Sequence, residues 1–213
     1  VRRTADMGAT AGIRLGIDPA ASFLGAAAAN AVLLLVFEAV VGEGEDELLR
    51  GLAGFLRAQQ QADGSVLGAW SRESERAVPG EWSTFGTGQT LWTFALMHRL
   101  FPDEGWDEPA RRLARYVATR RDEVEGHLLT FPDHWAAYGL AELGPDELGE
   151  PEIAYVRELA GILGLNSRLE SQSGPDGLRR LMRGEPASGA GLGTVTEGLA
   201  QLWRLSLADS RLT

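Results

Sequence analysis

Stretches of this chain that are apolar on nearly every side alternate with stretches that are apolar on one side only. The first kind spans residues 25–41, 87–100, 132–143 and 194–207. The second kind begins at Asp46, Asp107 and Glu150. A helix without a polar face is normally enclosed by other helices, whereas an amphipathic helix lies at a surface. The alternation therefore predicts an inner and an outer layer of helices.

Residue usage in these stretches favours helix over strand. Ala, Leu, Glu, Gln and Arg dominate, and Ile and Tyr are sparse. Short Gly- or Pro-containing turns follow most of the apolar stretches, which makes antiparallel hairpins the expected connection. In one amphipathic stretch we expect Asp107 to be the N-cap, with Pro109 in the first turn. The predicted fold class is all-α.

Two of the amphipathic stretches resemble each other. Residues 52–58 (LAGFLRA) align with residues 113–119 (LARYVAT), and in both cases an acidic residue followed by glycine comes soon after. These pairs are Asp63-Gly64 and Glu125-Gly126. Such self-similarity indicates a repeated helical hairpin.

A family resemblance rests on a few residues of the first copy, Arg50-Gly51, Phe55-Leu56, Gln60 and Gly64. They resemble the QW repeat of squalene-type cyclases, whose fold is an α/α toroid. Val66 stands where that motif has Trp, and the second copy lacks the Gln. Residues 86–100 and 133–143 are similar to inner helices of six-hairpin sugar-active proteins. The resemblance implies a partial or complete α/α toroid, with too few helices here for a full six-hairpin ring.

Charge and composition exclude several classes of function. The net charge is -10 and the pI is about 4.8, so nucleic acid and anionic membranes are poor partners. There is no Cys, and the His residues form no pair at metal-binding spacing, so no metal site is expected. The chain has no Lys for a phosphate-binding loop, and the run Gly189-x-Gly191-x-Gly193 follows no strand. No cofactor is therefore expected.

Residues 23–41 are a candidate for a membrane span, because the stretch is nearly long enough to cross a bilayer. It contains Asn30 and Glu38, and acidic residues follow it directly. We therefore expect a buried core helix and no stable membrane insertion. Residues 1–22 lack a clear period and predict an N-terminal arm, so that residues 23–213 form a single helical domain.

Candidate site residues gather where the inner helices begin, because parallel inner helices present their N-terminal ends at one mouth. The strongest group is Asp133, His134, Trp135 and Tyr138. Aromatic rings bind the apolar faces of sugars and carboxylates bind their hydroxyls, so this mixture suits a carbohydrate. The alternative is that Asp133 only supports its helix end while Trp135 and Tyr138 fill the core.

Other polar residues extend this candidate site. Gln89 and Trp92 are expected to line the same mouth, although Gln89 also fits a capping role. If residues 166–172 are extended, then Arg168, Glu170 and Gln172 point the same way, and a solvated loop is the alternative. The polar segment 65–85 contributes Trp82. Glu197 fits a capping box with Thr194, so we expect it to be structural.

The first hypothesis for function is a glycoside hydrolase or lyase acting on an oligosaccharide. Asp133 and Glu170 would form the acid and base pair. The other residues named above would bind the sugar: Trp82, Gln89, Trp92, His134, Trp135, Tyr138, Arg168 and Gln172. Two alternatives stay open, a non-catalytic binding or assembly module and an isoprenoid-binding relative of the cyclases. An incomplete ring would leave apolar edges that favour a second copy or a completing chain.

Overall fold

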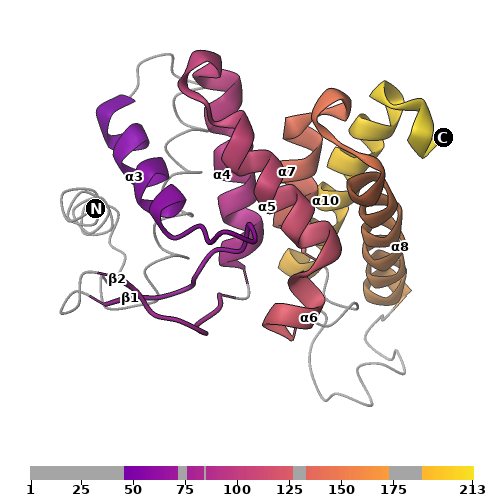
Figure 1. The fold of residues 1–213 in the computed structure, drawn as a ribbon. Helices are drawn as coiled ribbons and strands as arrows, with labels where there is room; N and C mark the ends of the chain where they lie inside the picture. The colour runs from indigo at the N-terminus through magenta and orange to yellow at the C-terminus, as the bar shows by residue number, and fades with distance from the viewer. Residues whose placement is uncertain (1–45, 72–75, 84, 127–132, 173–188) are drawn as a thin grey trace.

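The computed structural model describes residues 46–71, 76–83, 85–126, 133–172 and 189–213 (Figure 1). Its helices are α3 (Asp46–Ala58), α4 (Gly86–Leu100), α5 (Asp107–Thr119), α6 (Arg121–Glu125), α7 (His134–Leu143), α8 (Glu150–Gln172) and α10 (Gly189–Ala208). Short 3-10 turns are η1 (Pro102–Glu104), η2 (Pro145–Glu147) and η3 (Ser210–Leu212). Strands β1 (Trp70–Ser71) and β2 (Arg76–Ala77) pair antiparallel. The all-α prediction is confirmed for this part of the chain.

Helices α4 and α7 lie side by side in an inner layer and run in the same direction. At the start of α4, Gly88 lies against the carboxylate of Asp133, which immediately precedes α7. Further along, a Cβ atom at Gly139 of α7 would lie only 2.9 Å from the backbone nitrogen of Trp92 in α4. Because the contacting residues advance together along both helices, the two N-terminal ends meet at one end of the layer.

Helix α10 continues this layer on the other side of α7. Gly198 of α10 lies against His134 at the start of α7, and Arg204 pairs with Glu142 near the end of α7 at 4.0 Å. These contacts also advance in the same direction, so α10 is parallel to α7. The inner layer predicted from the apolar stretches is therefore present, in the order α4, α7, α10.

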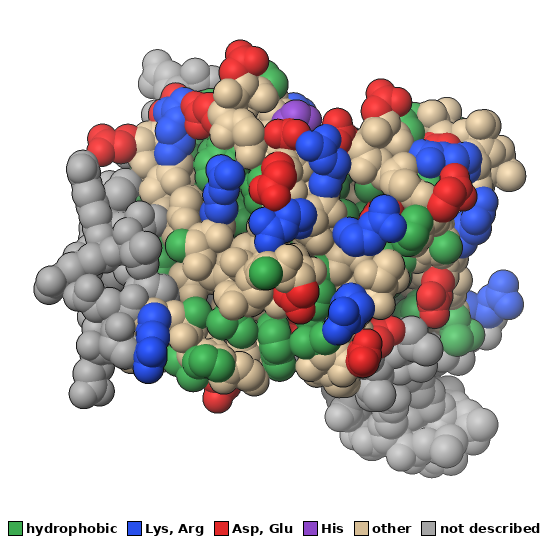
Figure 2. Space-filling view, viewed as in Figure 1, with side chains coloured by type: hydrophobic (Ala, Val, Ile, Leu, Met, Phe, Trp, Pro, Cys, Tyr) green, Lys and Arg blue, Asp and Glu red, His purple; other side chains and the backbone are tan. Residues whose placement is uncertain are grey.

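Helices α3, α5 and α8 form the outer layer, and α5 passes in front of α4 and α7 in Figure 1. Ion pairs join the neighbours: Arg111 of α5 contacts Glu147 at 2.7 Å, and Arg115 contacts Glu152 at 2.7 Å. Figure 2 shows Arg and acidic side chains interspersed over this face. Such a mixed, ion-paired surface is typical of a solvated outer layer.

The turn after α3 explains the repeated acidic-glycine pattern. Gly64 and Gly126 both adopt positive φ, 93° and 62°, a region that glycine enters without steric cost. Nε2 of Gln60 donates to the Pro109 carbonyl at 3.0 Å, which ties the end of α3 to the first turn of α5. Val66, at the position of the motif's Trp, is fully buried.

Three predicted helix boundaries are wrong. Asp107 is the first residue of α5 and not its N-cap, which is Trp106. Helix α10 begins at Gly189, so the glycine run lies inside a helix, because packing outweighs the weak helix propensity of glycine. Helix α8 continues through Gln172. At Asn166 the side chain donates to the Ile162 carbonyl at 2.9 Å, which a continuing helix accommodates.

Some predictions fall on residues that the structure does not describe. The arm (1–22), the apolar stretch 25–41 and a short helical piece expected at 176–182 all lie outside the described residues. Within the described ranges, none of the helices combines the length and hydropathy that crossing a membrane requires.

The close approach of α4 and α7 gives the first testable prediction. In Gly139→Ala the new methyl group meets Leu91 Cγ at 2.6 Å and the Trp92 nitrogen at 2.9 Å, so overpacking is expected to lower the unfolding free energy by about 1–3 kcal/mol. Gly161→Ala in α8 meets no atom within 4 Å and is expected to raise it by about 0.5–1 kcal/mol. Urea denaturation measures both. If both substitutions change the unfolding free energy by the same amount, the close approach of α4 and α7 at Gly139 is contradicted.

Candidate functional site

Asp133 lies where the N-terminal ends of α4 and α7 meet. Its Oδ1 accepts a hydrogen bond from the Ala136 amide at 3.1 Å, which caps α7. Its Oδ2 accepts from Arg121 of α6, and both side chains are only 1% exposed. A Cβ atom at Gly88 would lie 2.5 Å from Oδ1, so glycine is required opposite this carboxylate. Asp133 is therefore enclosed on every side by groups that neutralise or pack against it.

Arg121 holds a second carboxylate, Glu125, one turn along α6. The distance from Arg121 Nε to Glu125 Oε2 is 3.2 Å. The hydroxyls of Tyr116 and Thr87 donate to the other oxygen of Glu125, at 3.0 and 3.1 Å. A buried charge of this kind is stable only when it is paired and hydrogen-bonded throughout. The ionic network, meaning Arg121, Glu125 and Asp133, meets that condition.

Burial and pairing act against each other in this network. Burial raises the pKa of Glu125 above its usual value, and Arg121 opposes that shift. For Arg121, burial alone would lower the pKa, but the carboxylates of Asp133 and Glu125 raise it above its usual value. Burial also raises the pKa of Tyr116, which keeps its hydroxyl protonated as a donor. The Arg121 guanidinium thus stays charged inside the protein.

Next to the network lies the aromatic cluster, which consists of Trp92, His134, Trp135 and Tyr138. Trp92 of α4 stacks on Tyr138 of α7 with ring centroids 4.5 Å apart, and its ring lies 5.7 Å from that of Trp135. His134 lies 4.7 Å from Trp135. Trp92, Trp135 and Tyr138 are partly exposed, and His134 is 9% exposed. The structure therefore brings together most of the predicted sugar-binding rings.

Glu197 of α10 joins this cluster, which the sequence did not predict. The Tyr138 hydroxyl donates to Glu197 Oε2 at 2.7 Å, and the Glu197 side chain is exposed. Burial raises the pKa of Tyr138, and the bond to Glu197 raises it further. The predicted capping box is wrong, because Thr194 lies inside α10 and donates to the Gly191 carbonyl. An exposed carboxylate is thus fixed beside the rings.

Gln89 lies three residues before Trp92 on α4, which places both on adjacent parts of one helix face. The Gln89 Oε1 atom is buried and has no hydrogen-bond partner among the described residues, so it accepts no backbone amide and does not cap α4. A buried acceptor without a protein donor is uncommon.

The remaining candidates lie elsewhere. Trp82 is in the loop before α4, beside Gly68, and is not one of the stacked rings. Arg168 is exposed on α8. Glu170 and Gln172 belong to the last turn of α8, so the extended backbone that would align them with Arg168 is wrong, as is the alternative of a loop. The side chains of Glu170 and Gln172 lie outside the described residues.

Arg121 was not predicted as a site residue. It follows Arg120 in a run of charged residues, which is typical of a solvated turn, and Arg120 is indeed exposed. The only local signal is the spacing of Arg121 and Glu125, which places them on one face of a helix.

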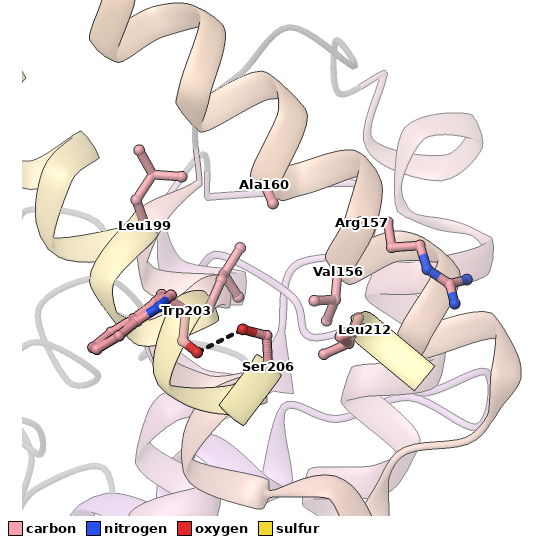
Figure 3. A pocket seen from close by; sticks show the side chains of 8 residues that line it. Val156, Arg157, Ala160, Leu199, Trp203, Ser206 and Leu212 are labelled. Atoms are coloured by element: carbon pink, nitrogen blue, oxygen red, sulfur yellow. Dashed lines mark hydrogen bonds between the residues drawn. The ribbon is translucent and has the colours of Figure 1, made fainter. Parts of the chain in front are cut away.

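A second surface feature is a groove between α8 and α10 with a volume of about 350 Å³ (Figure 3). Trp203 and Leu199 lie on one side of it, and Val156 and Leu212 lie on the other. Trp203 is 65% exposed, which is unusual for the largest apolar side chain. The groove is lined mainly by apolar side chains, with Arg157 at its rim. The groove therefore lies at one edge of the inner and outer layers of helices.

Neither metal chemistry nor relatives add to this description. Among the described residues, His, Asp and Glu side chains form no group of three that would hold a metal ion. Compared with protein-family models, curated proteins and solved structures, the chain has no significant match. The function of the site therefore has to be inferred from the positions of its side chains.

The ionic network predicts a large difference between two adjacent arginines. Arg121→Met leaves Glu125 and Asp133 buried without their counter-charge and is expected to lower the unfolding free energy by about 3–5 kcal/mol at pH 7. Arg120→Met removes only an exposed pair with Glu123 and is expected to change it by about 0–1 kcal/mol. Chemical denaturation measures both, and similar losses would contradict the network.

The pH dependence of the Arg121→Met variant has a definite sign. A group whose folded pKa is raised stabilises the fold below its unfolded pKa and loses that contribution as the pH rises through the folded pKa. The pKa of Glu125 is already raised by burial, and it rises further without Arg121. The stability deficit of Arg121→Met is therefore expected to shrink between pH 7 and about pH 5. A deficit that grows on acidification would overturn this assignment.

Proposed function

We propose that this protein binds an oligosaccharide at the aromatic cluster, together with Glu197 and Gln89. The observation that carries the proposal is the association of partly exposed rings with a fixed, exposed carboxylate. Trp92, Trp135 and Tyr138 offer ring faces for the apolar faces of sugar units. Glu197 offers exposed carboxylate oxygens as acceptors for sugar hydroxyls, and the partly buried side chain of Gln89 lies one turn before Trp92 on α4. A few convergent polar groups within an aromatic surface are the usual composition of a ligand site.

The proposal is binding and not hydrolysis. Asp133, one member of the predicted acid and base pair, is 1% exposed, caps α7 and is paired with Arg121. A general acid has to reach the proton acceptor on the substrate, within hydrogen-bond distance or through one water. Asp133 lacks that access, so its part in the proposal is to position α7 and the rings that α7 carries.

For the architecture, we propose that the two layers are part of an α/α toroid. Parallel inner helices, each followed by an antiparallel outer helix, are the arrangement that such a ring repeats. The groove between α8 and α10, with the exposed side chain of Trp203, supports the idea that a further hairpin or a completing chain continues the layers there.

An isoprenoid fits the same cluster less well. Glu197 would lose contact with water on covering by an apolar chain and would gain no donor in return. A sugar supplies hydroxyl donors to it.

Paired tryptophan variants test the proposal. With a panel of neutral, acidic and amino oligosaccharides, isothermal titration calorimetry is expected to detect binding of at least one class. Trp135→Ala removes a ring of the cluster and is expected to weaken that binding about tenfold or more, which corresponds to about 1.4 kcal/mol or more. Trp203→Ala removes a ring of similar size from the α8–α10 groove and is expected to leave it unchanged.

Two further measurements make the test decisive. Trp135 is partly buried, so a milder substitution, Trp135→Phe, is included because it keeps a ring at that position. Circular dichroism checks that each variant is folded. Reducing ends are assayed in the same mixtures, and none should be released. If sugars are cleaved and Asp133→Asn, once shown to be folded, abolishes cleavage, the hydrolase hypothesis replaces the binding proposal. If no sugar in the panel binds, the proposal fails.

A further inference from the structure

We infer that the sugar recognised at the aromatic cluster is an amino sugar that carries a free ammonium group. This inference rests on the proposed function and narrows it to one class of carbohydrate. It follows from the kinds of hydrogen-bonding groups, the ring faces and the charge that the described residues gather at one place.

The charged group exposed at the site is matched to a donor. The single proton of the Tyr138 hydroxyl is donated to Glu197 Oε2, so this pair presents carboxylate oxygens, which only accept. An ammonium group has three N–H donors and no acceptor, which is the complement of these groups.

The rings favour a cation as well. The faces of Trp and Tyr rings attract a positive charge within about 6 Å of the ring centroid. The ring centroids of Trp92, Trp135 and Tyr138 lie 4.5 to 6.0 Å from one another, so a cation over an exposed ring face of the cluster is near more than one ring. The net charge of -10 adds a long-range attraction for cationic ligands.

The charge at the site disfavours an acidic sugar. Its carboxylate would face the exposed carboxylate of Glu197. The nearest buried cation that the network provides, Arg121, is 1% exposed and already bonded to Glu125 and Asp133. A uronate therefore finds repulsion where an ammonium group finds a partner.

The experiment compares matched oligomers of glucosamine, N-acetylglucosamine and galacturonate by isothermal titration calorimetry at about pH 6. The glucosamine oligomer is expected to bind about tenfold more tightly than the N-acetylated one, which is the effect of about one charge-assisted hydrogen bond. Raising the salt concentration is expected to reduce this preference, because exposed charges are screened.

Matched charge variants locate the effect. Glu197→Gln keeps the size of the side chain and an oxygen that accepts from a sugar hydroxyl but removes the charge, so it is expected to weaken glucosamine binding about tenfold and N-acetylglucosamine binding by much less. Glu158→Gln removes the same charge from an exposed position on α8 and is expected to change neither. Since Glu197 is exposed, the variant is expected to fold like the parent protein.

The outcomes separate this inference from the proposed function. If all oligomers bind equally, or if galacturonate binds best, the amino-sugar inference fails while carbohydrate binding stands. The inference also fails if Glu158→Gln weakens glucosamine binding as much as Glu197→Gln does, because the attraction is then a general effect of net charge. If none of the oligomers binds, the proposed function and the inference fail together.

Discussion

The guanidinium of Arg121 connects α6 to the N-cap residue of α7. It bonds Glu125 within α6 and Asp133 at the start of α7, and Asp133 in turn packs on Gly88 of α4. Since removing one partner of a buried ion pair leaves an uncompensated charge, the three elements keep one relative position. The aromatic cluster is built on α4 and α7, so its geometry depends on this buried arginine.

The helices were largely predictable, because apolar periodicity reports directly on burial. The α4 and α7 stretches were placed to within a residue or two of their observed bounds. Errors arose where local residue preference opposes packing. The glycines at the start of α10 predict a loop, yet that segment is helical and shifts Thr194 and Glu197 from a helix start to its interior. Local patterns do not contain the packing energy that decides such cases.

The site was predictable only where its residues are neighbours in the sequence. His134, Trp135 and Tyr138 occupy successive turns of one helix, so their grouping follows from helix geometry. Glu197 is 59 residues from Tyr138, and nothing in its local sequence indicates that contact. Arg121 and Arg120 have the same chemistry and adjacent positions, but one is buried and the other exposed. Only the tertiary packing around α6, which the local sequence does not indicate, distinguishes them.

Two of the ion pairs that hold the hairpins join residues that are near in sequence, and this has a consequence for how the chain acquires its fold. Arg121 and Asp133 are 12 residues apart, and Arg111 and Glu147 are 36 apart. Closing a short loop costs less entropy than closing a long one, so these contacts are able to form before the more distant ones. During synthesis each hairpin is able to dock on the one before it. In evolution, a unit added at the α8–α10 edge lengthens the array without rebuilding the hairpins already formed.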